Sequence, residues 1–196
     1  MKIVHLIAGI ALSATPSLAE ETTQLDAHEH GVGQLNIAFD ENKVAMELHA
    51  PGADIVGFEY GAKSDVDLAA IDAALQTLSN PLGLFLLPEA ASCIVITAHA
   101  KLESEESDHD DHDEEGHDDH DEEGHDDHDE APGHTEFHAE YLLECANLTE
   151  MSAITFSYFE IFPNALELEV QVISDKGATA FEIERDVAKL DLRGIF

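Results

Sequence analysis

Residues 109–132 repeat an eight-residue unit, HDDHDEEG, HDDHDEEG and HDDHDEAP, and this segment cannot form a hydrophobic core. It contains no apolar side chain to bury before Ala131, and its glycines allow the chain to bend. We therefore expect residues 103–132 to be a disordered insert within one folded domain. Whatever else the chain folds into must accommodate this insert between two ordered segments.

The repeat places two histidines three residues apart in every unit, surrounded by carboxylates. Imidazole nitrogen and carboxylate oxygen are ligands for borderline divalent metals, above all Zn²⁺, whereas a Ca²⁺ site gains nothing from histidine. A solvated acidic linker is the alternative interpretation, but it does not explain histidines in strict register. The predicted ligands in the insert are His109, His112, His117, His120, His125, His128, Asp110, Asp113, Asp118, Asp121, Asp126 and Asp129.

The formal net charge is −35, and it argues against two classes of partner. A strongly acidic chain repels nucleic acid and anionic lipid headgroups, while it raises the local concentration of cations. We therefore expect no nucleic-acid binding, and Zn²⁺ or another divalent transition metal as the bound ion.

The first 19 residues, MKIVHLIAGIALSATPSLA, are typical of a secretory signal peptide. Lys2 precedes a short apolar run, and Ser17 and Ala19 are small residues at the positions that a signal peptidase reads. The run is shorter than the roughly 20 residues that span a bilayer, and we expect no membrane insertion. The expected mature chain, residues 20–196, is long enough for a single metal-binding domain outside the cytoplasm.

Cys93 and Cys145 flank the insert, one on each side. In an exported chain, two cysteines favour a disulfide, and closing so long a loop stabilises the fold by roughly 4 kcal/mol. A zinc site that uses both thiolates is the rival interpretation.

Apolar periodicity predicts an α+β fold with a mostly antiparallel sheet and one amphipathic helix. Residues 34–50 alternate around the turn DEN and form a hairpin, and residues 64–79 have helical spacing after a Ser64 cap. The segments on either side of the insert alternate as well, so the insert is expected to replace the turn of a hairpin. Residues 165–173 form a further strand, and SAITFSYFEIF before it suits a strand or a helix.

Histidines outside the insert suggest a second, ordered metal site. His28 and His30 lie on one face of an extended chain just before the first strand. His134 and His138 follow the insert, with Glu136 and Glu140 on the same face. We predict an ordered site that combines the first pair with one or both of His134 and His138.

A directly cross-strand pair of cysteines would set the register of the hairpin around the insert. It would pair residue 99 with residue 139 and so place His99 on the face opposite His138.

The chain resembles the ZrgA-like periplasmic zinc-uptake proteins of Gram-negative bacteria in several segments. These are AHEHG, PGADIVGFEYGA, LFLLPEAASC, HTEFHAEYLLECAN after a His/Asp-rich loop, and FPNALELEVQVI. The resemblance implies a periplasmic protein that captures zinc and assists a membrane importer or its solute-binding receptor. It also implies that His28, His30, His134 and His138 are the family's metal ligands.

Two alternatives to zinc uptake remain at this point. A periplasmic metal buffer or detoxification protein would share every one of these features. A zinc-dependent hydrolase is less well supported, because the chain has no H-E-x-x-H or G-x-S-x-G motif. We therefore expect a protein that is not an enzyme.

Overall fold

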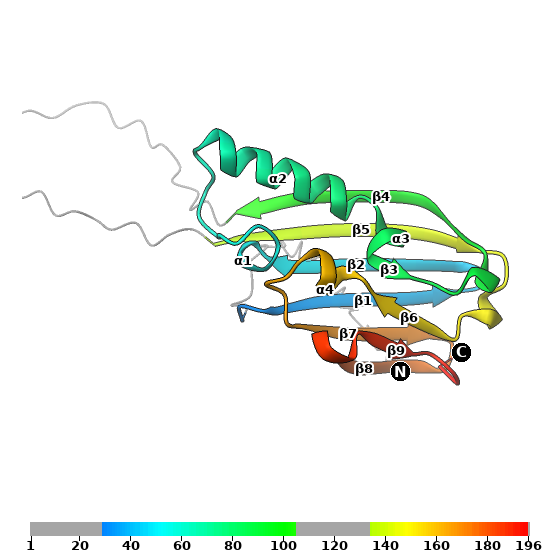
Figure 1. The fold of residues 1–196 in the computed structure, drawn as a ribbon. Coiled ribbons are helices and arrows are strands. Elements are labelled where there is room, and N and C mark those ends of the chain that lie inside the picture. Colours follow the sequence, from blue (N-terminus) through cyan, green and yellow to red (C-terminus); the bar gives the residue numbers. More distant parts are fainter. Residues whose placement is uncertain (1–28, 105–133, 196) are drawn as a thin grey trace, which may run out of the picture.

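A computed structural model describes residues 29–104 and 134–195. The expected signal peptide and nearly all of the expected insert lie outside these residues. The described chain forms two layers, a large six-stranded sheet and, over one of its faces, a layer of short helices, one longer helix and a small three-stranded sheet (Figure 1). The strand order of the large sheet is β4-β5-β2-β1-β7-β8, and that of the small sheet is β3-β6-β9.

The elements follow one another along the chain with short connections. The large sheet comprises β1 (Val32–Asp40), β2 (Lys43–Pro51), β4 (Cys93–Ser104), β5 (Thr135–Cys145), β7 (Glu167–Ser174) and β8 (Gly177–Glu184). The second layer comprises α1 (Gly52–Ile55), α2 (Asp65–Leu78), α3 (Pro81–Leu84), β3 (Phe85–Leu86), β6 (Ala153–Phe156), α4 (Tyr158–Ile161) and β9 (Lys189–Asp191). The fold is therefore mostly β, and the predicted α+β class overstates its helical part.

The predicted hairpin of residues 34–50 is present as β1 and β2, paired antiparallel from Gln34↔His49 to Asp40↔Lys43. Glu41 has a φ of 52°, which is the left-handed conformation that this tight turn requires. The other neighbour of β1 is β7, and this pair is parallel, with Val32 opposite Glu167. Antiparallel pairing thus dominates the sheet, as predicted, with one parallel pair that the sequence pattern did not indicate.

The predicted helix of residues 64–79 is present as α2. The Ser64 side chain accepts a hydrogen bond from the Asp67 backbone N–H at 3.1 Å, which caps the first turn. Ile71 and Leu78 are buried beneath the helix, whereas Leu68 remains half exposed. The ambiguous segment SAITFSYFEIF divides into strand β6 and the single turn α4.

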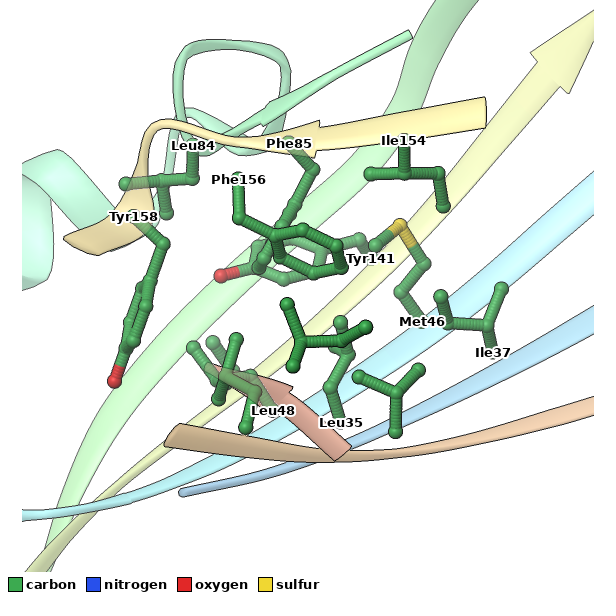
Figure 2. Packing of buried hydrophobic residues seen from close by; sticks show 14 of the residues in the cluster. Leu35, Ile37, Met46, Leu48, Leu84, Phe85, Tyr141, Ile154, Phe156 and Tyr158 are labelled. Atoms are coloured by element: carbon green, nitrogen blue, oxygen red, sulfur yellow. The ribbon is translucent and has the colours of Figure 1, made fainter. Parts of the chain in front are cut away.

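The core lies between the two layers (Figure 2). Alternate residues of the large sheet point into it, and aromatic side chains of the second layer meet them there. Phe85 of β3 packs edge-on against Tyr141 of β5 at a ring-centroid distance of 6.1 Å, and against Phe156 of β6 at 5.9 Å. The opposite face of the large sheet presents polar side chains to solvent, and we call it the open face.

Strands β4 and β5 form the hairpin that the insert interrupts, and Cys93 lies directly opposite Cys145, to which it is disulfide-bonded. The predicted disulfide is confirmed. The register beyond it differs from the prediction, because a β-bulge between Val95 and Thr97 adds one residue to β4. His99 therefore lies opposite Glu140 instead of residue 139, and so on the same face as His138. The prediction that His99 and His138 lie on opposite faces was wrong.

The Cys93→Ser variant is expected to melt about 10 °C lower than the wild type, because the bridge closes a loop between residues 52 positions apart and contributes about 4 kcal/mol. Thermal unfolding followed by circular dichroism measures the shift, with the reduced wild type as a matched control. An unchanged melting temperature, or two reactive thiols in native protein, would contradict a structural disulfide.

Candidate metal centre

Three side chains that could hold a metal ion meet on the open face of the large sheet, on the neighbouring strands β2 and β5. Met46 and Leu48 of β2 point into the core, so the two-residue alternation turns Glu47 and His49 outward. On β5, His138 is directly opposite His49. Cross-strand neighbours lie on the same face, and the strand geometry alone therefore brings these side chains together. We call Glu47, His49 and His138 the sheet cluster.

Both imidazoles of the sheet cluster direct their Nε2 atoms at one carboxylate oxygen. Glu47 Oε1 lies 3.4 Å from His49 Nε2 and 3.1 Å from His138 Nε2. The two rings are stacked, with centroids 4.3 Å apart and planes inclined by 20°. The three ligand atoms lie within 4.8 Å of one another, so one ion can reach all of them. Glu140 adds a further carboxylate oxygen 3.9 Å from His138 Nε2.

The other nitrogen of each ring faces a second carboxylate. His49 Nδ1 is 3.3 Å from Glu136 Oε2, and His138 Nδ1 is 3.8 Å from Glu103 Oε1. A carboxylate behind a metal-binding histidine fixes the orientation of the ring and increases the basicity of the ligating nitrogen. Both rings of the sheet cluster thus have the environment that zinc-binding imidazoles usually have.

These contacts shift the pKa values of the cluster in opposite directions. The contact with Glu136 raises the pKa of His49 above its usual value, against burial, and Glu47 raises it further. Burial alone would raise the pKa of Glu47, but the contacts with His49 and His138 outweigh it and lower the pKa. The metal-free cluster therefore favours a carboxylate beside a protonated imidazole, and an incoming metal ion displaces that proton.

Zinc affinity at the sheet cluster is consequently expected to fall with decreasing pH, by about tenfold per pH unit once His49 holds its proton. Because the pKa of His49 is raised, this fall begins at a higher pH than it would for an isolated histidine. Zinc titrations of the tightest site at several pH values between about 5.5 and 7.5 measure it. An affinity that does not change over this range would show that no histidine of the cluster binds the ion.

A second group of ligands, the end cluster, consists of His30, Glu59 and His134. Glu59 Oε2 lies 2.9 Å from His30 Nε2 and 2.9 Å from His134 Nδ1. The two histidines precede β1 and β5, which begin at the same end of the large sheet, and Glu59 belongs to the connection between α1 and α2 (Figure 1). The His30 and His134 side chains are 64% and 53% exposed, compared with 29% and 11% for His49 and His138.

Local backbone structure positions His30. The next residue, Gly31, has a φ of +90°, and a Cβ there would lie 2.9 Å from the Leu166 side chain. Its N–H donates to the buried carboxylate of Asp54 at 2.8 Å, which ties this turn to α1. The HG pair of the AHEHG motif is thereby held beside the end of the sheet.

The structure divides the predicted ordered site in two. It brings His30 and His134 together, while His138 lies four residues farther along β5 in a different group. Glu136 and Glu140 flank His138, as the alternation predicted, with Glu136 behind the neighbouring His49. His28, the six insert histidines and the six insert aspartates lie outside the described residues, and their predicted roles stay predictions.

Sequence reasoning missed three residues of the two clusters, Glu47, His49 and Glu59. The pattern E-L-H at residues 47–49 lies on the polar face of an alternating strand, and this signal could have identified Glu47 and His49. Nothing in FEYGA distinguishes Glu59, because it approaches the histidines only through the fold.

Two nitrogens and one carboxylate oxygen in each cluster form a donor set that suits Zn²⁺ better than Ca²⁺ or Mg²⁺. The sequence matches the family described as ZrgA family zinc uptake protein over residues 27–192. The chain belongs to the ZrgA family. This match extends over both clusters and over the segments on both sides of the insert. The resemblance suggested by the sequence motifs is confirmed, and zinc is the metal that the family description names.

A search of curated proteins found no match to the chain. In the described ranges 29–104 and 134–195, no helix is long and apolar enough to cross a membrane.

Proposed function

We propose that this ZrgA-family protein is a periplasmic zinc carrier, with the sheet cluster as its ordered zinc site, and that it supplies zinc to a membrane importer. The observation that carries the proposal is the convergence of two imidazole nitrogens and one carboxylate oxygen on rigid neighbouring strands. Zinc is the cargo of this protein, and no chemical reaction is required of it.

Two ligand separations in the sheet cluster are close to those of a zinc tetrahedron. Two ligands that are each about 2 Å from a tetrahedral ion lie roughly 3.3 Å apart. The separations from Glu47 Oε1 to His49 Nε2 and His138 Nε2 are 3.4 and 3.1 Å, close to this value. The two stacked rings must turn out of their parallel arrangement so that both Nε2 lone pairs point at one ion. Glu140 is 66% exposed and can rotate to become the fourth ligand, or a water molecule can take that position.

In this proposal the insert differs in role from the sheet cluster. Its six histidines and numerous carboxylates offer many equivalent ligand sets, and its charge attracts cations. A segment with so few apolar side chains to bury loses conformational entropy when it wraps an ion, so each of its sites is proposed to bind only modestly. It collects zinc, and the preorganised sheet cluster holds it.

Location outside the cytoplasm is supported by two observations. The N-terminal sequence has the features of a signal peptide, and the Cys93–Cys145 disulfide is typical of oxidising compartments. The partner is proposed to be an inner-membrane importer or its solute-binding receptor.

Growth under zinc limitation tests the uptake role. Cells that carry the His49→Ala/His138→Ala chain are expected to grow more slowly than wild-type cells in zinc-depleted medium, and added zinc should restore them. Cells with the Asp72→Ala chain, altered at an exposed position of α2, are the matched control. Normal growth in depleted medium combined with sensitivity to excess zinc would favour a buffering or detoxification role instead.

A further inference from the structure

Strand β5 connects the end cluster to the sheet cluster. His134 precedes the strand, and Glu136 and His138 follow at every second residue on one side of the extended chain. Two residues of a strand span about 6.7 Å, so His134 and His138 are separated by about 13 Å, with a carboxylate halfway. Glu136 already contacts the sheet cluster through His49, at 3.3 Å.

The end cluster has three potential ligand atoms of its own. The two separations of 2.9 Å from Glu59 Oε2 are slightly shorter than the roughly 3.3 Å of a zinc tetrahedron. Glu59 is only 12% exposed, so the fold fixes the carboxylate, whereas the two histidines lie on segments just outside strands and are more than half exposed. Less constrained, better hydrated ligands release an ion more readily than ligands held within strands.

The position of the end cluster favours it as the first of the two clusters that an incoming ion reaches. His134 lies two residues after the predicted insert of residues 103–132, so the chain that leaves the insert passes directly through this cluster. The sheet cluster lies farther along the same strand, and its histidines are less accessible to solvent.

We propose that the end cluster is a second site for divalent transition metals, and that ions pass from it to the sheet cluster by ligand exchange along β5, through Glu136. This transfer rests on the proposed zinc site in the sheet cluster. The end cluster binds more weakly and exchanges faster, and the sheet cluster binds more tightly. The direction of transfer therefore follows from the difference in affinity.

A tryptophan reporter follows the arrival of metal at the sheet cluster. The chain contains no tryptophan, and exposed His99 lies opposite Glu140, beside the sheet cluster and on the side away from β1. In the full-length H99W protein, Co²⁺ bound at the sheet cluster is expected to quench the tryptophan, and stopped-flow mixing with Co²⁺ gives the loading rate. Equilibrium titration of the same signal gives the affinity.

Replacing both histidines of the end cluster, H30A and H134A, in the H99W background is expected to slow loading at least tenfold. The equilibrium affinity of the sheet cluster for Co²⁺ should stay within twofold of that of the H99W parent. The matched control changes two exposed side chains that belong to neither cluster, D72A and E160A, and should load at the parent rate. An E136Q change is expected to slow loading even with the end cluster intact.

Three results would overturn the transfer proposal. An unchanged loading rate in the H30A/H134A protein would mean that ions reach the sheet cluster without binding the end cluster. A faster rate would mean that the end cluster competes with the sheet cluster for ions. Equal losses of rate and affinity would mean that the two clusters form one joint site. The H49A/H138A changes in the same background separate this proposal from the zinc site itself, because quenching that persists there would refute the sheet cluster as the site.

Discussion

Replacing His138 by alanine is expected to weaken the tightest zinc binding of the mature protein at least 100-fold. The side chain is only 11% exposed and supplies one of three converging ligand atoms, so water cannot substitute for it without a change of geometry. Removal of a carboxylate behind a ligating histidine already costs about 10–100-fold in metal affinity, and loss of the ligand itself costs more. His49→Ala should have an effect of the same size.

Calorimetric zinc titration measures this loss, and His99→Ala is the matched control. His99 is an exposed histidine on the same face of the sheet, opposite Glu140, but it belongs to neither cluster. Its replacement should leave the affinity of the tightest zinc site within about twofold of the wild-type value, a much smaller change than the 100-fold loss expected for a ligand. Equal effects of His99→Ala and His138→Ala would mean that general loss of imidazole, and not the sheet cluster, determines binding.

Deleting residues 104–131 is expected to remove most of the zinc-binding capacity while leaving the fold and the tight site intact. The deletion takes out all six insert histidines. The β4–β5 ladder still extends from the disulfide at Cys93 to the pair Glu103↔Glu136, and Pro132-Gly133 can form the new turn. The sheet cluster lies within this ladder and its neighbour β2, so its geometry does not depend on the insert.

Zinc stoichiometry at saturation, together with circular dichroism, tests the deletion. Unchanged stoichiometry would show that the insert binds no zinc. An unfolded variant would show that the insert is not a separable part of the domain. Loss of the high-affinity zinc binding in a folded deletion variant would place the high-affinity site in the insert.

Local patterns in the sequence were sufficient for the elements with strong periodicity. The β1–β2 hairpin and helix α2 with its Ser64 cap follow from short-range signals. The disulfide between Cys93 and Cys145 follows from the presence of only two cysteines in a chain expected to be exported. The parallel pairing of β1 with β7 joins strands more than 100 residues apart in the chain, and no local signal encodes it. The small sheet is built from strands of two to four residues, which are too short to show alternation.

The predicted ordered site and the two clusters overlap only in part, and the register of β4 explains one difference, the placement of His99. Ile94, Val95 and Ile96 are all apolar, so the alternation does not show which of them is the extra residue of the bulge. A one-residue shift moves every later side chain to the other face, and His99 was therefore placed wrongly. His138 was one of the predicted ligands, and the structure places it opposite His49 on the neighbouring strand and not beside the histidines of the AHEHG motif.

The location of a single zinc ion is the most direct test of the proposed function. Crystals of the mature protein with one equivalent of zinc, measured at the zinc absorption edge, give the position of the ion independently of its affinity. The proposal predicts one anomalous peak on the open face, about 2.0–2.1 Å from Nε2 of both His49 and His138 and at a similar distance from the Glu47 carboxylate. A first peak between His30 and His134, or no peak on the large sheet, would contradict it.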